Sequence, residues 1–465
     1  MKLKIRRTVD IGTAFLTIMM LWQVYNFAVP LFLEDLLLRL LPKASKIMIG
    51  VIMALDNLVA LFMIPLVGYL SDKTKTKWGK RVPYIFVGVI LSSVAFMAVP
   101  FVYNAANAAE TTGMLFVLIF NLLLVLVFMN AYRSPAVALM PDITPKQLRS
   151  KANSIINIMG GVGALIGFAA NLFFNKAEGE IYLPFIIVAV FMALALMYFL
   201  MRVNENKFVS EYESELAEYN RKLEAGELRP EEILPDEEKE AEFSEQQQKV
   251  KGAKLPRHLL FVLLTVFFVY MSVNAVETFL SLYSSNVLGT EKYAKLFIPV
   301  FAVTGFAFAI PSSMFAAKLG RRLVILLGCI IMGVCYLMLY GFQLACTGLG
   351  WTPYLMNIPF LFAGVGFSFV VVNIYPMAVQ SSDEKDLGKF TGMYYTASML
   401  AQSITPALSG ALMTVPAFGY PALMPYSAVF MGLAYLSLLL AMPTKSKRKK
   451  FLSEIGGEVP PDGEM

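Results

Sequence analysis

The sequence predicts an all-α integral membrane protein with twelve transmembrane helices in two pseudo-symmetric halves of six. Of its 465 residues, 57% are hydrophobic and only 15% are charged, with 36 Phe and 27 Met against one His. A soluble chain of this length needs more charge to cover its surface. Apolar runs of about 20 residues, long enough to cross a bilayer, recur along the chain between polar loops.

The first half contains six apolar runs, near residues 11–33, 47–70, 82–104, 114–138, 152–174 and 182–202. The second half contains six more, near residues 258–281, 294–318, 322–346, 353–379, 391–415 and 420–442. The run that begins at Ile11 is too long for a cleavable signal peptide and is followed by no small-residue cleavage site. We therefore expect the amino terminus to stay in the cytoplasm.

Basic residues gather in alternate loops, and this bias predicts the orientation. The basic clusters comprise Lys146, Arg149 and Lys151; Lys318, Arg321 and Arg322; and Lys385 and Lys389. The loops near 105–112, 347–352 and 416–419 carry almost no Lys or Arg. Because short basic loops remain inside, both termini are predicted to be cytoplasmic in a multi-pass protein of the cell membrane. The net charge of +6 does not indicate nucleic acid as a partner, because the Lys and Arg residues lie in loops that are expected to face the anionic inner leaflet of the lipid bilayer.

The chain divides into four segments. Residues 1–202 form the first half, 203–257 a cytoplasmic connector, 258–442 the second half, and 443–465 a cytoplasmic tail rich in Lys and Arg. The connector is rich in Glu and has too few large apolar residues for a core, so it is expected to be solvated and partly helical around 209–225.

The two halves echo each other in sequence. The fourth span contains NAYRSP at residues 130–135, and the tenth span contains NIYP at residues 373–376. The loop sequence WGKR at 78–81 has a counterpart, LGRR, at 319–322. Repeated halves are typical of transporters in which a site at their interface opens alternately to either side.

A charged loop between the second and third spans is predicted to act as a cytoplasmic gate. Five basic residues lie between positions 73 and 81, next to an acidic residue and two glycines at the helix ends. The residues assigned to this gating loop are Asp72, Lys73, Trp78, Gly79 and Arg81. We expect the acidic and basic side chains to form a charge-locked hinge where neighbouring helices meet.

This loop, SDKTKTKWGKRVP at 71–83, resembles that of the glycoside–pentoside–hexuronide cation symporters and the related sucrose transporters of the major facilitator superfamily. The twelve spans and the long central connector are similar to theirs as well. The resemblance implies the major facilitator fold, a sugar or glycoside as substrate, with a disaccharide favoured, and coupling to H⁺ or Na⁺.

The resemblance also implies site residues, and this chain departs from several of them. Arg133 stands where melibiose permeases have an aspartate, and Val137 stands where they have a tryptophan and sucrose transporters an arginine. Ala60 and Ile64 occupy the places of the aspartate pair of Na⁺-coupled members. The sequence therefore favours H⁺ as the coupling ion.

Three ionisable residues lie inside the predicted spans: Asp56, Arg133 and Glu277. An unpaired charge in hydrocarbon costs roughly 2.5–3.5 kcal/mol, so such residues usually face a pathway or a partner. Asp56 and Glu277 are the predicted proton-coupling residues. Two alternatives remain open. Glu277 can simply lie at the outer membrane interface, and Asp56 and Arg133 can form an ion pair that is purely structural.

Amides and aromatic rings within the spans are the candidates for sugar binding, because they can meet hydroxyl groups and the apolar face of a sugar ring. The predicted substrate-binding residues are Trp22, Gln23, Tyr25, Asn26, Asn57, Asn130, Arg133, Asn157, Asn274, Asn373, Tyr375, Tyr395 and Gln402. Amides also join transmembrane helices to each other, so we expect only part of this set to contact substrate. Closely spaced glycines in the fifth span predict tight helix packing.

The sequence contains no pattern typical of an enzyme, a cofactor site or a metal site. The only histidine is His258, and Cys329, Cys335 and Cys346 lie in one apolar run without metal-ligand spacing. The prediction is a monomeric secondary transporter for a sugar, working by H⁺ symport. An exporter or facilitator of another small polar solute and a transporter-like sensor are the alternatives.

Overall fold

A computed structural model of the protein describes residues 3–109, 112–145, 148–225, 257–349, 352–379 and 387–441. The first part contains α1 (Ile5–Leu40), α2 (Ser45–Lys73), α3 (Val82–Ala109), α4 (Thr112–Asp142), α5 (Arg149–Asn171), α6 (Leu183–Arg202) and α7 (Glu205–Glu224). The second part contains α9 (Arg257–Val287), α10 (Ala294–Ala307), α11 (Ala309–Leu319), α12 (Arg321–Leu349), α13 (Asn357–Val379), α14 (Leu387–Thr414) and α15 (Leu423–Leu440), with short 3₁₀ helices η3 (Pro353–Met356) and η5 (Tyr420–Ala422).

Within the described residues, every predicted span falls on helix, although α5 ends at Asn171, three residues before the expected end of its span. Among the described residues, ten helices are long and apolar enough to cross a membrane, and α10 with α11 make an eleventh span if they are taken together. Helix α14 lies at the predicted span 391–415 but is not among these, because it carries polar side chains such as Gln402, Thr405 and Ser409.

The span 294–318 is broken where α10 meets α11, with a bend of 49°. Pro311, near the start of α11, has no N–H to donate to the carbonyl of Ala307, so the helix cannot run straight through this point. The freed backbone groups need neighbours inside the protein, since lipid cannot bond them.

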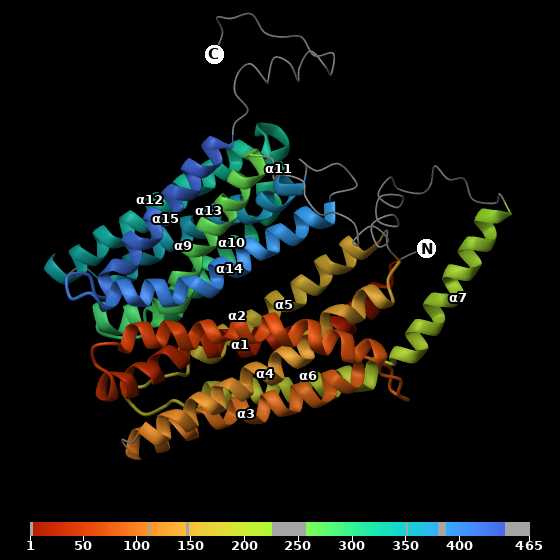
Figure 1. Ribbon diagram of the computed structural model, residues 1–465, viewed down its shortest axis with the longest axis horizontal. Helices are drawn as coiled ribbons and strands as arrows, with labels where there is room; N and C mark the ends of the chain where they lie inside the picture. The colour runs from red at the N-terminus through yellow and green to blue at the C-terminus, as the bar shows by residue number, and fades with distance from the viewer. Residues whose placement is uncertain are drawn as a thin grey trace, which may run out of the picture.

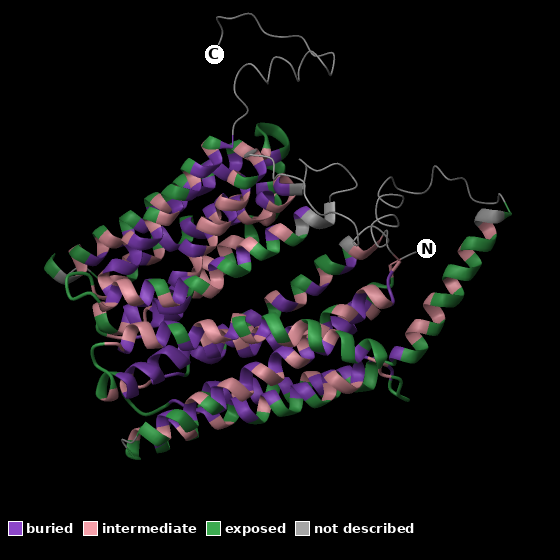
Figure 2. Cartoon of the chain, in the orientation of Figure 1, coloured by how far each residue is buried: buried purple, intermediate pink, exposed green. Residues whose placement is uncertain are grey.

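The helices form two bundles (Figure 1). Helices α1 to α6 pack mainly against one another, as do α9 to α15, while α2 packs on α14, α1 on α9, and α5 on α10 between the halves. Large apolar side chains such as Ile310, Phe62 and Phe116 are exposed. Buried residues concentrate between the helices (Figure 2). This distribution is that of a protein whose outer surface contacts lipid.

Glycines allow the closest helix contacts. A Cβ at Gly50 of α2 would overlap the carbonyl of Pro406 in α14, and one at Gly410 of α14 would overlap the carbonyl of Lys46. In the fifth span Gly160, Gly163 and Gly167 pack on α1, and a Cβ at Gly167 would lie 2.7 Å from the carbonyl of Met20. Gly161 faces Phe306 of α10 at ordinary contact distance. The predicted tight packing of that span therefore occurs within the first half.

The connector begins with α7, which starts at Glu205 instead of the expected 209 and runs beside the amino terminus (Figure 1). Its Glu211 forms ion pairs with Lys4 and Arg7 of the first half. Connector residues 226–256, the tail 443–465, and the loop residues Lys146 and Lys385 lie outside the described residues.

We expect Gly50→Ala to destabilise the contact between the halves, because the added methyl group has only backbone to meet. Overpacking of this kind costs about 1–3 kcal/mol, so the melting temperature of the purified protein in detergent should fall. Gly432→Ala in α15 is the matched control, since a Cβ there meets nothing within 4 Å. Equal melting temperatures for the two variants would contradict the close packing of α2 on α14.

Candidate functional site

A cavity of about 350 Å³ lies where α1 and α5 face α9, α10, α12 and α13. Its polar side chains are Gln23, Asn26, Glu277, Tyr336 and Ser368. Six phenylalanines line it as well: Phe27, Phe168, Phe301, Phe306, Phe360 and Phe367. Gly305, Phe306 and Ala309 flank the break between α10 and α11, so the bend shapes one wall.

One hydrogen bond at this cavity joins the two halves. Asn26 of α1 donates from Nδ2 to Oε1 of Glu277 in α9 over 3.1 Å. Gln23 lies one helical turn before Asn26, and both project to the same side of α1. Glu277 thus stands in the cavity wall, where its carboxylate can bind a proton or a polar ligand group. Of the predicted substrate-binding residues, Gln23 and Asn26 line this cavity.

A second group of predicted residues lies in the first half. The guanidinium of Arg133 stacks over the ring of Trp22, with 5.1 Å between its Cζ and the ring centroid. The charge of Arg133 acts on Asp56, but within the described part of the chain no ion pair within 4.0 Å joins the two. Asn130 donates a long hydrogen bond of 3.4 Å to Asp56. The alternative of a close structural ion pair therefore has no support from the geometry.

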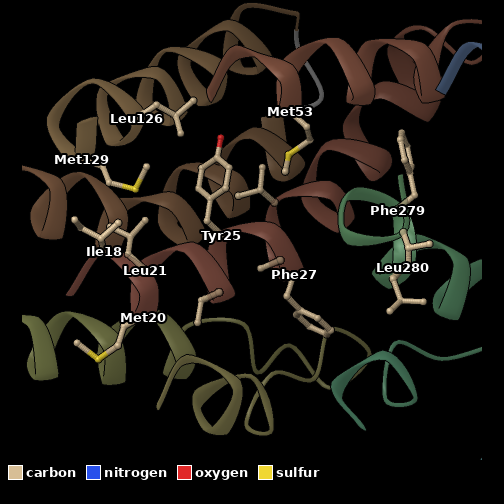
Figure 3. Close-up of a cluster of buried hydrophobic side chains, with 14 of the residues drawn as sticks. Ile18, Met20, Leu21, Tyr25, Phe27, Met53, Leu126, Met129, Phe279 and Leu280 are labelled. Atoms are coloured by element: carbon tan, nitrogen blue, oxygen red, sulfur yellow. The ribbon is translucent and has the colours of Figure 1, made fainter. Parts of the chain in front are cut away.

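Tyr25 borders this group. Its ring lies among Met53, Leu126 and Met129 (Figure 3). The hydroxyl of Tyr25 and Oδ1 of Asn130 are buried and have no hydrogen-bond partner among the described residues. Buried polar atoms are seldom left unpaired because desolvation is costly, so both oxygens are candidates to bond a ligand.

Other predicted substrate residues serve as contacts between helices. Asn373 donates to Oγ of Ser312 over 2.8 Å and joins α13 to α11. Asn57 of α2 donates to the carbonyl of Gln402 in α14 over 3.3 Å, and so links the halves. These bonds fit the known use of amides as interhelical contacts.

The remaining candidates lie apart from the cavity walls just described. Oδ1 of Asn274 is buried without a partner among the described residues, and Asn157 is exposed. Tyr375 packs against Tyr394 and Tyr395, with ring centroids 5.2 Å and 6.4 Å away. This cluster joins α13 to α14, and the exposed fraction of Tyr395 is 56%.

The structure brings together two charged residues of the predicted gating loop, Asp72 and Arg81. Arg81 is buried and bonds Asp72, and its Nε lies 3.0 Å from Oδ2 of Asp142 at the end of α4. Lys80 contacts the same carboxylate at 3.0 Å. The expected charge lock therefore joins α2, α3 and α4. Lys73 lies over the ring of Tyr69, and the exposed Trp78 packs edge-on against Phe86.

Glu205, which the sequence did not single out, completes this loop. Its carboxylate accepts hydrogen bonds from the backbone N–H groups of Lys80, Arg81 and Val82 over 3.0, 2.9 and 3.0 Å. Gly79 has a φ of 107°, and a Cβ there would overlap this carboxylate. An anion at the N-terminus of a helix is stabilised by the free N–H groups, and Glu205 does this for α3.

Two bundles around a cavity, with bonds that cross from one half to the other, are the arrangement expected of a membrane transporter. The sequence model of the Major Facilitator Superfamily matches residues 11–406, with a second match at 262–461. The chain belongs to this superfamily, and it is a transporter and not an enzyme.

Curated relatives match only in part. The chain is 29% identical over 125 residues to the sucrose transport protein SUC3 of Arabidopsis thaliana, which covers 24% of this chain and 21% of that protein. It is 30% identical over 120 residues to the sucrose transport protein SUT1 of Oryza sativa subsp. japonica, covering 23% and 22%. The aligned region thus spans about a fifth of the length of each relative.

Solved structures are similar over nearly the whole chain. A bacterial homologue of the iron transporter ferroportin in an inward-facing state has a TM-score of 0.66 at 15% identity, covering 95% of this chain and all of that one (100%). A D-xylose-proton symporter has a TM-score of 0.64 at 13% identity, covering 94% and 98%. At these identities the similarity shows the fold alone.

Removal of the Glu205 carboxylate should loosen the charged loop. We expect Glu205→Ala to lower the stability of the purified protein by about 2–4 kcal/mol, because three backbone N–H groups lose a charged acceptor. Thermal unfolding and protease cleavage near residue 80 would measure this. Glu213→Ala, on an exposed position of the same helix, should leave both unchanged. If the two variants behave alike, the carboxylate does not hold the loop.

Proposed function

We propose that the protein carries a sugar or glycoside, with a disaccharide favoured, across the cytoplasmic membrane by H⁺ symport with alternating access. The observation that carries the proposal is the cavity between the halves, where Asn26 of one half bonds Glu277 of the other. A ligand bound there would contact both halves and could bias their relative position. In this proposal the loop at 72–81 and both termini face the cytoplasm, and the protein acts as a monomer.

Substrate class rests on the chemistry of the site and on the relatives. Amides of Gln23 and Asn26 and the carboxylate of Glu277 can bond hydroxyl groups, and the surrounding rings can cover the apolar face of a sugar. Arg133 stacked on Trp22 offers further donors to hydroxyl pairs. The sequence similarity to sucrose transport proteins supports the same class.

Proton coupling is assigned to Asp56 and Glu277. Both carboxylates lie inside the membrane-spanning helices, Asp56 next to Asn130 and near Arg133, and Glu277 in the cavity wall. Asp56 is buried, and burial makes the charge of a carboxylate expensive. Glu277 is exposed to the cavity and accepts a hydrogen bond from Asn26. Taking up a proton changes which partners each carboxylate keeps. Such a change can couple proton movement to a change in the contacts between helices.

A second candidate function follows from the six phenylalanines of the cavity. Most of its wall is apolar, which also suits a less polar small solute that is exported or carried without an ion gradient. Uptake of a labelled disaccharide panel into proteoliposomes, with and without a pH gradient, separates the two. Accumulation driven by ΔpH supports sugar symport. Absence of uptake for every sugar would overturn it.

Asp56→Asn should abolish uphill accumulation while downhill exchange of the same substrate persists, because the amide cannot carry a proton. Transport by the wild type should depend on ΔpH and not on Na⁺. Asp10→Asn is the control: this buried carboxylate of α1 bonds Tyr198 over 2.7 Å outside the cavity. Full accumulation by Asp56→Asn, or stimulation by Na⁺ at fixed pH, would falsify the assignment.

Arg133→Lys should weaken substrate binding about tenfold or more, because Lys keeps the charge but loses the planar fork of donors. Binding to the purified protein measures this directly. Arg322→Lys is the matched control, since that guanidinium bonds the carbonyl of Leu438 in the second half. Unchanged affinity in Arg133→Lys would remove Arg133 from the substrate site.

A further inference from the structure

The end of the bundle opposite the charged loop at 72–81 holds an unassigned carboxylate. We call this the distal end; there α1 ends at Leu40 and α9 at Val287. Glu34 of α1 is 5% exposed. Both of its carboxylate oxygens accept from Nδ2 of Asn286, over 3.0 and 2.9 Å, and Oε1 also accepts from the hydroxyl of Tyr420 over 2.5 Å.

All three hydrogen bonds cross from the first half to the second. Asn286 belongs to α9 and Tyr420 to η5, which precedes α15. A hydrogen bond to an ionised acceptor is roughly twice as strong as one between neutral groups. One N–H of Asn286 is shared between the two carboxylate oxygens, since its Nδ2 also donates to the carbonyl of Leu282. With the hydroxyl of Tyr420, two donors of the second half thus hold this one buried side chain, and Glu34 is a polar connection between the halves at this end.

The charged groups around Glu34 do not neutralise it by direct contact. Asp35, Lys46 and Lys176 act on it electrostatically, yet no ion pair within 4.0 Å involves Glu34 in the described ranges of the chain. Lys176 pairs with Asp35 over 2.6 Å. Lys46 donates to the carbonyl of Met413 over 3.0 Å and lies 4.6 Å from the centroid of the Tyr420 ring.

We propose that Glu34 latches the distal gate of the transporter: its bonds to Asn286 and Tyr420 hold the halves together at this end and must break when the cavity opens there. Glu34 is then a positioning residue that sets the balance between the two states, and it need not touch substrate. The inference rests on the proposed alternating access. It does not depend on which solute is carried.

Asp35 provides a matched control on the neighbouring position. It is also a carboxylate, and it too accepts from a tyrosine hydroxyl and a nitrogen donor, Tyr103 and Lys176. Both of these partners belong to the first half. A latch predicts that loss of the Glu34 bonds, which cross between the halves, shifts the opening of the distal end. Loss of the Asp35 bonds removes only contacts within the first half, and the backbone N–H of Lys176 keeps its own bond to Glu291 of the second half over 3.2 Å.

The test is the rate at which a cysteine in the cavity reacts from the distal side. Cys329, Cys335 and Cys346 are replaced by alanine, and Ala302→Cys is introduced in the cavity wall. A separate variant, Lys292→Cys, marks the distal side of sealed vesicles, because Lys292 is exposed in the distal loop. A membrane-impermeant maleimide is added from the side at which this variant reacts. Glu34→Ala should raise the labelling rate of Ala302→Cys about tenfold or more. Asp35→Asn should change it less than about twofold.

Tyr420→Phe and Asn286→Ala remove the same bonds from the other half and should raise the rate in the same direction. If Glu34→Ala does not fold, these two variants test whether the bonds of Glu34 keep the distal end closed. Unchanged labelling in these variants, or an equal rise in Asp35→Asn, overturns the latch. The labelling assay uses no substrate, so it can be interpreted even if the protein carries no sugar. Conversely, the wild type can take up sugar even if the labelling assay shows no latch.

Discussion

The structure depends on one constraint: inside hydrocarbon, every backbone N–H and C=O must find its partner within the protein. The described part of the chain meets this demand almost entirely with long helices. The exception is the break before Pro311, where the helix cannot continue its bonds. The break borders the cavity, so irregular backbone occurs beside a cavity and not against lipid. Side-chain amides in the spans also need partners within the protein, and Asn373 and Asn57 find theirs on neighbouring helices.

The two ends of the bundle are held in different ways. At the charged loop, Arg81, Asp142 and Glu205 bond within the first half, and α7 extends this cluster toward the amino terminus. At the distal end, Glu34 and Lys295 bond across to the opposite half. Rigid contacts within one half and breakable contacts between halves are what a rocking motion requires. Close glycine packing of α2 on α14 keeps those surfaces near each other.

The cavity is lined by polar side chains and by aromatic rings. Its amides and its carboxylate gather on α1 and α9, while the phenylalanines come mainly from α10 and α13. Hydroxyl groups and an apolar ring face can both be accommodated by such a wall. Arg133 and Trp22, with Asp56 close by, form a charged group in the first half alone. The proposed proton-coupling carboxylates are divided between these two places, with Glu277 in the cavity wall and Asp56 beside the charged group.

The sequence by itself determined the membrane class, the positions of the helices and the charged loop, because apolar runs and basic clusters are local patterns. It also singled out Asn26, Glu277 and Arg81 from residue type and position, and the structure places the first two at the cavity and Arg81 in the charged loop. The tertiary structure alone decided which amides line the cavity and which join helices, and it revealed Glu205 and Glu34. The bonds of Glu34 link positions more than 250 residues apart, at separations of 252 and 386. No local periodicity encodes such a pair, since the contact exists only after the two halves have packed.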